Sequence, residues 1–129
     1  MIRRKGMKTR RSGFTPAEKL LKLEIAERDN YTCPISGRPG QDLCHVFIPK
    51  NTLKGESGHK TYSKYNLLYG DHEVNMNWTK PDRLTAANYL IKLYGVEAIQ
   101  DWIDSLGLRS PFSVVRWLSS LEPRNSNVE

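Results

Sequence analysis

Two adjacent residues, Cys44 and His45, are the first candidates for chemistry in this chain. They lie in the apolar run 43–48, which reads as a β-strand that Pro49 ends. Side chains alternate between the two faces of a strand, so these two are not expected to bind one metal ion together. They can instead have two different roles: one side chain binds a metal ion and the other takes a proton from a water molecule.

A second group of polar residues follows a long polar loop over 50–65. It consists of Asn66, Asp71, His72 and Asn75. Asp71 is expected to cap a helix that runs to about Trp78. In that helix, positions 71 and 75 share a face and His72 points elsewhere.

The order of these segments resembles that of the HNH, or His-Me finger, nucleases. The core of that family is a β-hairpin followed by a helix, which together hold one divalent metal ion. The matching segments are RDNYTCPISG at 28–37, CHVFIP at 44–49, and residues 66–75. The resemblance covers residues 28–78. It is nearest to the branch with a terminal Asn, which includes the phage Holliday-junction resolvases of the recombination-endonuclease type.

The resemblance assigns roles to individual residues. His45 takes the position of the general base, and Asn66 that of the central Asn, which braces the loop and orients the base. Cys44 and Asn75 take the positions of the two metal ligands, with Asp71 and His72 as rivals. The implied cofactor is one divalent ion, with Mg²⁺, Mn²⁺ and Zn²⁺ all open.

The chain departs from the family pattern at two places. The optional structural zinc needs four cysteines, and here Cys33 is followed by Ser36, Asp71 and Val74 at the other three positions, so no structural zinc is expected. In addition, a neutral thiol at Cys44 is a poor ligand for Mg²⁺. Three interpretations follow: the site uses another metal, Asp42 or Asp71 supplies the carboxylate, or the metal site is degenerate.

The charge balance favours a polyanionic partner. The formal net charge is +6 and the pI is about 9.4. Six of the first eleven residues are basic, which predicts a flexible arm over residues 1–14 that contacts DNA phosphates. The expected DNA-binding residues are Arg3, Arg4, Lys5, Lys8, Arg10 and Arg11 in the arm, with Lys50, Lys54, Lys60 and Lys64 in the loop.

The length of 129 residues predicts a single domain of the α+β class over 15–122, followed by a tail over 123–129. We expect a ββα-metal core at 28–78, flanked by an N-terminal helix at 16–28 and a C-terminal helical segment at 82–122. The core hairpin is expected to span about 31–48. The C-terminal helices are expected at 82–94, 96–106 and 110–121. With two cysteines and no apolar leader or membrane span, the expected location is the cytoplasm, that of the host cell for a phage-encoded protein.

Two functions of different classes follow. The first is a metal-dependent DNA endonuclease of HNH type, with His45 as the general base. The alternative is a catalytically degenerate HNH-like module that binds DNA or protein. A zinc-binding module using Cys33, Cys44 and His72 is a weaker third interpretation. No membrane partner is expected, and the oligomeric state is left open, a dimer included.

Overall fold

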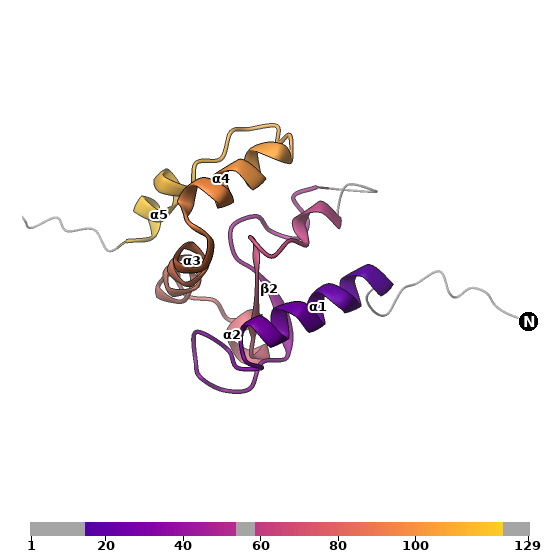
Figure 1. The fold of residues 1–129 in the computed structure, drawn as a ribbon. Coiled ribbons are helices and arrows are strands. Elements are labelled where there is room, and N and C mark those ends of the chain that lie inside the picture. The colour runs from indigo at the N-terminus through magenta and orange to yellow at the C-terminus, as the bar shows by residue number, and fades with distance from the viewer. Residues whose placement is uncertain (1–14, 54–58, 123–129) are drawn as a thin grey trace, which may run out of the picture.

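The computed structural model describes residues 15–53 and 59–122, and within these ranges the fold is α+β (Figure 1). The expected basic arm, Lys54 and the expected tail lie outside them. The elements in chain order are α1 (Pro16–Arg28), β2 (Asp42–His45), β3 (Leu67–Gly70), α2 (His72–Met76), α3 (Lys80–Tyr94), α4 (Val96–Ser105) and α5 (Val114–Leu121). No helix in these ranges is long and apolar enough to cross a membrane.

Helix α1 begins where the sequence predicts. The Thr15 hydroxyl accepts a hydrogen bond from the Glu18 backbone N–H, and the Glu18 carboxylate accepts one from the Thr15 N–H, both at 3.1 Å. This reciprocal capping box, with Pro16 at the first turn, satisfies two N–H groups that the helix itself cannot pair. At the other end, Arg28 and Asp29 anchor the helix to the sheet. Arg28 donates to the Leu67 carbonyl at 2.8 Å, and Asp29 accepts from the Tyr69 N–H at 2.8 Å.

The sheet pairs strands that are distant in sequence, which corrects the predicted hairpin over 31–48. Strand β2 runs antiparallel to β3, with Cys44 opposite Leu68 and His45 opposite Leu67. In the predicted partner segment, the structure has a single bridge between Thr32 and Pro39. The reason is that residues 33–38 close on themselves in a tight turn, in which the Cys33 N–H donates to the Arg38 carbonyl at 2.7 Å.

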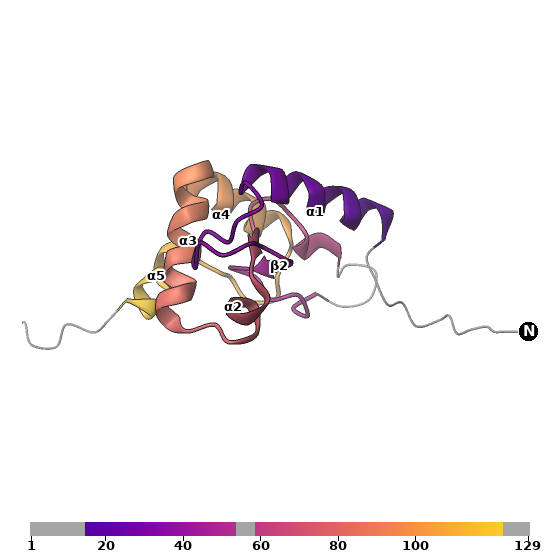
Figure 2. The same cartoon turned by 90° about the horizontal axis from the view of Figure 1, so that it is seen from below.

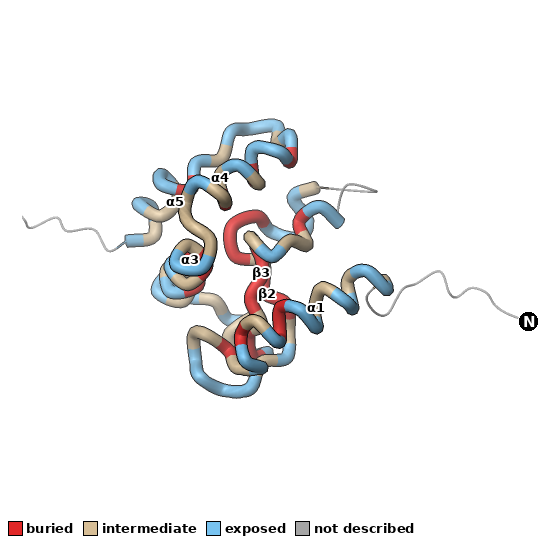
Figure 3. The backbone as a smooth tube through the Cα atoms, in the orientation of Figure 1, coloured by how far each residue is buried: buried red, intermediate tan, exposed pale blue. Residues whose placement is uncertain are grey.

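The sheet is packed on both faces. Leu43 and Leu67 point toward α1 and form a small cluster with Ile25. Cys44 and Leu68 point the other way, into the main core, which the C-terminal helices complete with Ala86, Ala87, Leu90, Ile99, Ile103 and Val114. Figures 1 and 2 show α1 on one side of the strands and α3 on the other, and Figure 3 shows the buried residues following the strands and the loop beside them.

Three helices differ from the prediction by two residues or more, and capping residues account for two of these differences; α4 ends one residue early. α3 begins at Lys80, two residues early, because Thr79 and Asp82 form a capping box. α5 begins only at Val114, because the Ser113 side chain caps it by accepting from the Arg116 N–H. α2 ends at Met76 and has only five residues.

Candidate functional site

His45 lies at the end of β2, half-buried, on the face that carries Leu43 and Leu67. Its Nε2 is 3.2 Å from the Thr61 hydroxyl oxygen, and its ring packs edge-on against Tyr62 with centroids 4.8 Å apart. Burial, and then the nearby positive charge of Lys50, lower the pKa of His45 from 6.5 to about 4. The imidazole is therefore neutral at physiological pH and can accept a proton.

Asn66 is fully buried and braces the segment that follows His45. Its Oδ1 accepts hydrogen bonds from the backbone N–H groups of Phe47 and Ile48, at 2.8 and 2.9 Å. Its Nδ2 donates to the carbonyls of Ile48 and Thr61, at 2.9 and 3.0 Å. One side chain thus fixes the chain after the histidine and also the residue whose hydroxyl contacts the imidazole, which is the bracing role that the resemblance implies for this Asn.

Asp42, at the start of β2, joins the strand to α2. Its Oδ2 accepts hydrogen bonds from His72 Nδ1 at 2.8 Å and from Asn75 Nδ2 at 3.0 Å. The expectation that positions 71 and 75 share a face and that His72 points elsewhere is therefore corrected. Asp71 precedes the helix as its N-cap, whereas residues three apart within a helix, such as His72 and Asn75, are neighbours on one face.

Cys44 points into the main core and is fully buried. It packs against Gly70 of the paired strand, where an added Cβ would lie 2.5 Å from the Cys44 Sγ, so the close packing needs a glycine there. Burial, followed by the nearby Cys33 and Asp42, raises the pKa of the Cys44 thiol to about 12. This protonated thiol lies in the core and is not among the residues that line the cavity beside His45.

Three of the four positions that the resemblance assigns to a structural zinc, Ser36, Asp71 and Val74, are linked here by hydrogen bonds. The Ser36 hydroxyl donates to Asp71 Oδ2, and Asp71 Oδ1 accepts from the Val74 N–H at 2.9 Å. Arg38 adds an ion pair to the same Asp71 carboxylate at 3.2 Å. Although burial opposes them, these contacts lower the pKa of Asp71. These contacts attach the turn over 33–38 to the start of α2, and they occupy both carboxylate oxygens of Asp71.

A cavity of about 410 Å³ lies beside β2. Its walls include His45 from one face of the sheet and Asp42 and Asn75 from the other, so it follows the edge of β2 that faces away from β3. Three cations contribute to the lining: Lys22 from α1, Lys50 from the loop and Arg83 from α3. Arg83 also lies over the ring of Trp78, with its Cζ 5.2 Å from the centroid.

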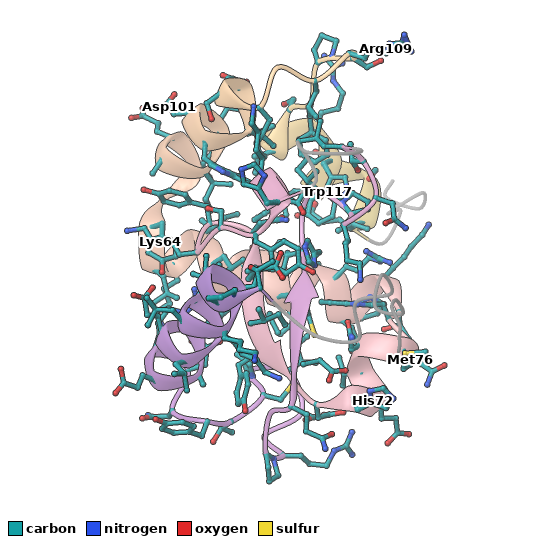
Figure 4. All side chains as sticks on the ribbon, turned by 90° about the vertical axis from the view of Figure 1, so that its right-hand side faces the viewer. Lys64, His72, Met76, Asp101, Arg109 and Trp117 are labelled. Atoms are coloured by element: carbon teal, nitrogen blue, oxygen red, sulfur yellow. The ribbon has the colours of Figure 1, made fainter. Side chains whose placement is uncertain are left out.

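Among the lysines expected to bind DNA, the structure brings Lys50 to this cavity but not Lys60 or Lys64. Lys64 lies over Tyr65 and Tyr94, with Nζ 5.3 and 5.4 Å from the ring centroids. Figure 4 shows Lys64 on the opposite side of the ribbon from His72 and Met76.

The sequence interpretation named neither Lys22 nor Arg83 as a site residue. Both lie on helices outside the segment that resembles the nucleases, and nothing in their sequence context separates them from other surface cations. The residue type most useful for a hard metal ion, the carboxylate of Asp42, was named only as one way of compensating for Cys44. The alternation of side chains along the strand is the signal that could have pointed to Asp42. It places Asp42 and Cys44 on one face, and of these two Asp42 is the residue that contacts α2.

In the described parts of the chain, no group of three or more His, Cys, Asp or Glu side chains is placed to hold a metal ion. Comparisons of the chain with protein-family models, with curated proteins and with solved structures find no match.

Proposed function

We propose that this protein is a metal-dependent endonuclease of HNH type that hydrolyses phosphodiester bonds in DNA, and that β2, β3 and α2 form its ββα-metal core. The observation that carries the proposal is the cavity beside β2. Its lining contains a neutral imidazole, a carboxylate with an adjacent amide, and three cationic side chains. A phosphodiester hydrolase requires a base, a cation near the scissile phosphate and groups that hold the phosphates in place.

His45 is the general base in this proposal. In the tautomer that carries the proton on Nε2, the Thr61 oxygen accepts that hydrogen at 3.2 Å, and Nδ1 keeps the lone pair that takes a proton from water. The low pKa ensures that the ring is neutral before substrate binds. A phosphate group beside Lys50 offsets the lysine charge, which raises the pKa of His45 and makes it a stronger base when it is needed.

Asp42 and Asn75 are the residues that would hold the divalent ion. Each gives one side-chain atom to their mutual hydrogen bond, Oδ2 of Asp42 and Nδ2 of Asn75. The remaining oxygen of each side chain has no partner among residues 15–53 and 59–122, and both residues line the cavity. Two protein oxygens suit Mg²⁺ or Mn²⁺, which are usually held by few side chains together with water and substrate phosphates. When bound, such an ion supplies Lewis-acid stabilisation of charge on the phosphate and on the leaving oxygen.

Lys22, Lys50 and Arg83 supply the contacts to the phosphates. They come from three separate elements and line the same cavity as His45, Asp42 and Asn75, so the DNA backbone can be held on both sides of the scissile bond. The net charge of +6 adds a general attraction for DNA that needs no base contacts.

The degenerate module that binds DNA without cleaving it is the second candidate. It is favoured by the position of Cys44, because the residue at the family's first ligand position is committed to the core. It is also favoured by the hydrogen bond between His72 and Asp42, which already provides the carboxylate with a partner.

Plasmid nicking distinguishes the two candidates. The purified full-length protein is incubated with supercoiled DNA in Mg²⁺, Mn²⁺ or Zn²⁺, with EDTA as the metal-free arm. We expect nicking in Mg²⁺ or Mn²⁺, no nicking in EDTA, and a ligatable product with a 5′-phosphate. The variants His45→Gln and Asp42→Asn should lose at least about 100-fold in rate, and His59→Gln, which changes a histidine outside the cavity lining, should not. DNA binding without nicking in any metal would support the degenerate module instead.

A further inference from the structure

His72 makes a contact that none of the roles described above requires. Its Nδ1 lies 2.8 Å from Asp42 Oδ2, the same oxygen that accepts the hydrogen bond from Asn75. The His72 side chain is 63% exposed and the Asp42 side chain 28% exposed, so the pair lies at the edge of the cavity and not in the core. Figure 4 shows His72 on α2, beside the start of the strand.

A second hydrogen bond attaches the same residue to the strand. The backbone N–H of His72 donates to Gln41 Oε1 at 3.3 Å, and the Gln41 N–H donates to the Gly70 carbonyl at 2.8 Å. The backbone and the ring of His72 are thus bonded to two consecutive residues, 41 and 42. One bond from the backbone and one from the ring therefore give this exposed residue a defined position relative to Asp42.

We propose that His72 is a positioning residue that orients the Asp42 carboxylate for a divalent metal ion, an inference that rests on the proposed function. The last torsion of an aspartate side chain is soft, so a carboxylate with one partner can turn. Here two donors, from His72 and Asn75, meet on one oxygen. They fix the carboxylate plane and leave the other oxygen directed away from both donors.

His72 acts through Asp42 and does not itself bind the ion. The cavity walls contain Asp42 and Asn75 but not His72, and the ring nitrogen nearest the carboxylate is already engaged with it. Hydrogen-bond partners of metal-binding carboxylates typically change metal affinity by 10–100-fold when they are removed.

The test is Mn²⁺ binding to the full-length protein, measured by isothermal titration calorimetry without DNA. His72→Ala removes the donor. His72→Asn keeps an amide nitrogen close to the position of Nδ1, whereas His72→Gln moves it one bond further out. His59→Ala is the control for loss of an exposed imidazole, and Asp42→Asn removes the charge of the ligand itself. Thermal melting without metal is recorded for every variant.

We expect His72→Ala to weaken Mn²⁺ binding by about 10–100-fold. His72→Asn should restore most of the affinity and His72→Gln little of it, with no change in His59→Ala or in the melting of the metal-free variants. Wild-type affinity in His72→Ala would overturn the inference and, if Asp42→Asn still abolished binding, would leave the proposed function standing. Equal losses in His72→Ala and His72→Asn would also overturn it, since a hydrogen-bond role predicts rescue. Absence of Mn²⁺ binding to the wild type would overturn both.

Discussion

The side-chain amide of Asn75 donates a hydrogen bond of 3.0 Å to Oδ2 of Asp42, although 33 residues separate them in the chain. This bond joins the first residue of β2 to α2. Its two residues are the ones proposed to hold a metal ion between the strand and the helix. It also supports the proposed role of Asp42, which lies three residues before the histidine that is proposed as the base.

Replacement of Cys44 by Asp is expected to destabilise the protein without creating a metal site. The new carboxylate would be buried against Gly70 and Leu68, in a core cluster that contains only apolar residues in the described part of the chain. An uncompensated buried charge costs about 3–5 kcal/mol of unfolding free energy. Urea unfolding measures the loss, and Cys44→Ala, which leaves only a small void, should lose less. A Cys44→Asp protein as stable as the wild type, or one that gains Mg²⁺-dependent nicking, would contradict this placement of the side chain.

Asn66→Ala should be among the most destabilising substitutions of a polar residue in this chain. It would remove the hydrogen bonds that the buried N–H groups of Phe47 and Ile48 donate to the side chain, and the two that the side chain donates to backbone carbonyls. Each such group costs about 1–3 kcal/mol, so we expect a total loss of about 3 kcal/mol or more. The matched control is Asn77→Ala, which removes one exposed hydrogen bond to Glu73 and should change stability by less than about 0.5 kcal/mol. Similar losses in the two variants, measured by urea unfolding, would rule out the bracing role.

The pKa of His45 predicts a specific dependence of stability on pH. The folded protein keeps the ring neutral down to about pH 4, whereas an unfolded chain protonates it near 6.5. Between these values the unfolded state binds the extra proton, so stability is full above about pH 6.5 and falls as the pH drops toward 4. His45→Gln should flatten this part of the profile and His59→Gln should not. Parallel profiles for wild type and His45→Gln would contradict the lowered pKa.

Arg83→Gln should weaken DNA binding at every sequence tested and reduce the slope of log affinity against log salt by about one. Arg83→Lys keeps the charge but loses the planar contact with Trp78, so it should preserve the slope and still lose affinity. Fluorescence anisotropy with a labelled duplex over a range of KCl concentrations gives both quantities. Arg109→Gln is the control, because Arg109 is far from His72 in Figure 4 and lines a different cavity. Equal effects at the two arginines would show that only the net charge matters.

The arm over residues 1–14 lies outside the described residues, and its role is tested directly. Deletion of residues 1–11 removes six positive charges and no acidic residue. DNA binding should weaken and its salt dependence should become shallower, because fewer counterions are released. Melting should be unaffected, since the segment has no apolar face to bury. An unchanged salt slope would mean that the arm makes no contact with DNA.

Local signals in the sequence were enough to predict several elements. Thr15, Pro16 and Glu18 specify the start of α1, because a capping box is made within four residues of chain. Asp71 specifies the start of α2 because its side chain caps the first turn, and Gly95 specifies the end of α3 because it adopts a positive φ that favours glycine. The adjacency of Cys44 and His45 in a strand predicted their separation onto opposite faces, which depends only on the alternation of side chains.

Tertiary structure alone decided which strand pairs with β2, and hence where the site lies. Residues 31–33 and the apolar run 66–69 are both candidates for the second strand. The choice between them depends on packing against Ile25 and the C-terminal helices, which no local pattern encodes. That pairing buries Cys44 and leaves Asp42 at the edge beside His72 and Asn75. It also brings Lys22 and Arg83, 61 residues apart in the sequence, to one cavity. Such contacts arise between segments that are distant in sequence. The sequence therefore suggested a base and a helix for the proposed metal site, whereas the fold determined that Asp42 is the carboxylate beside them.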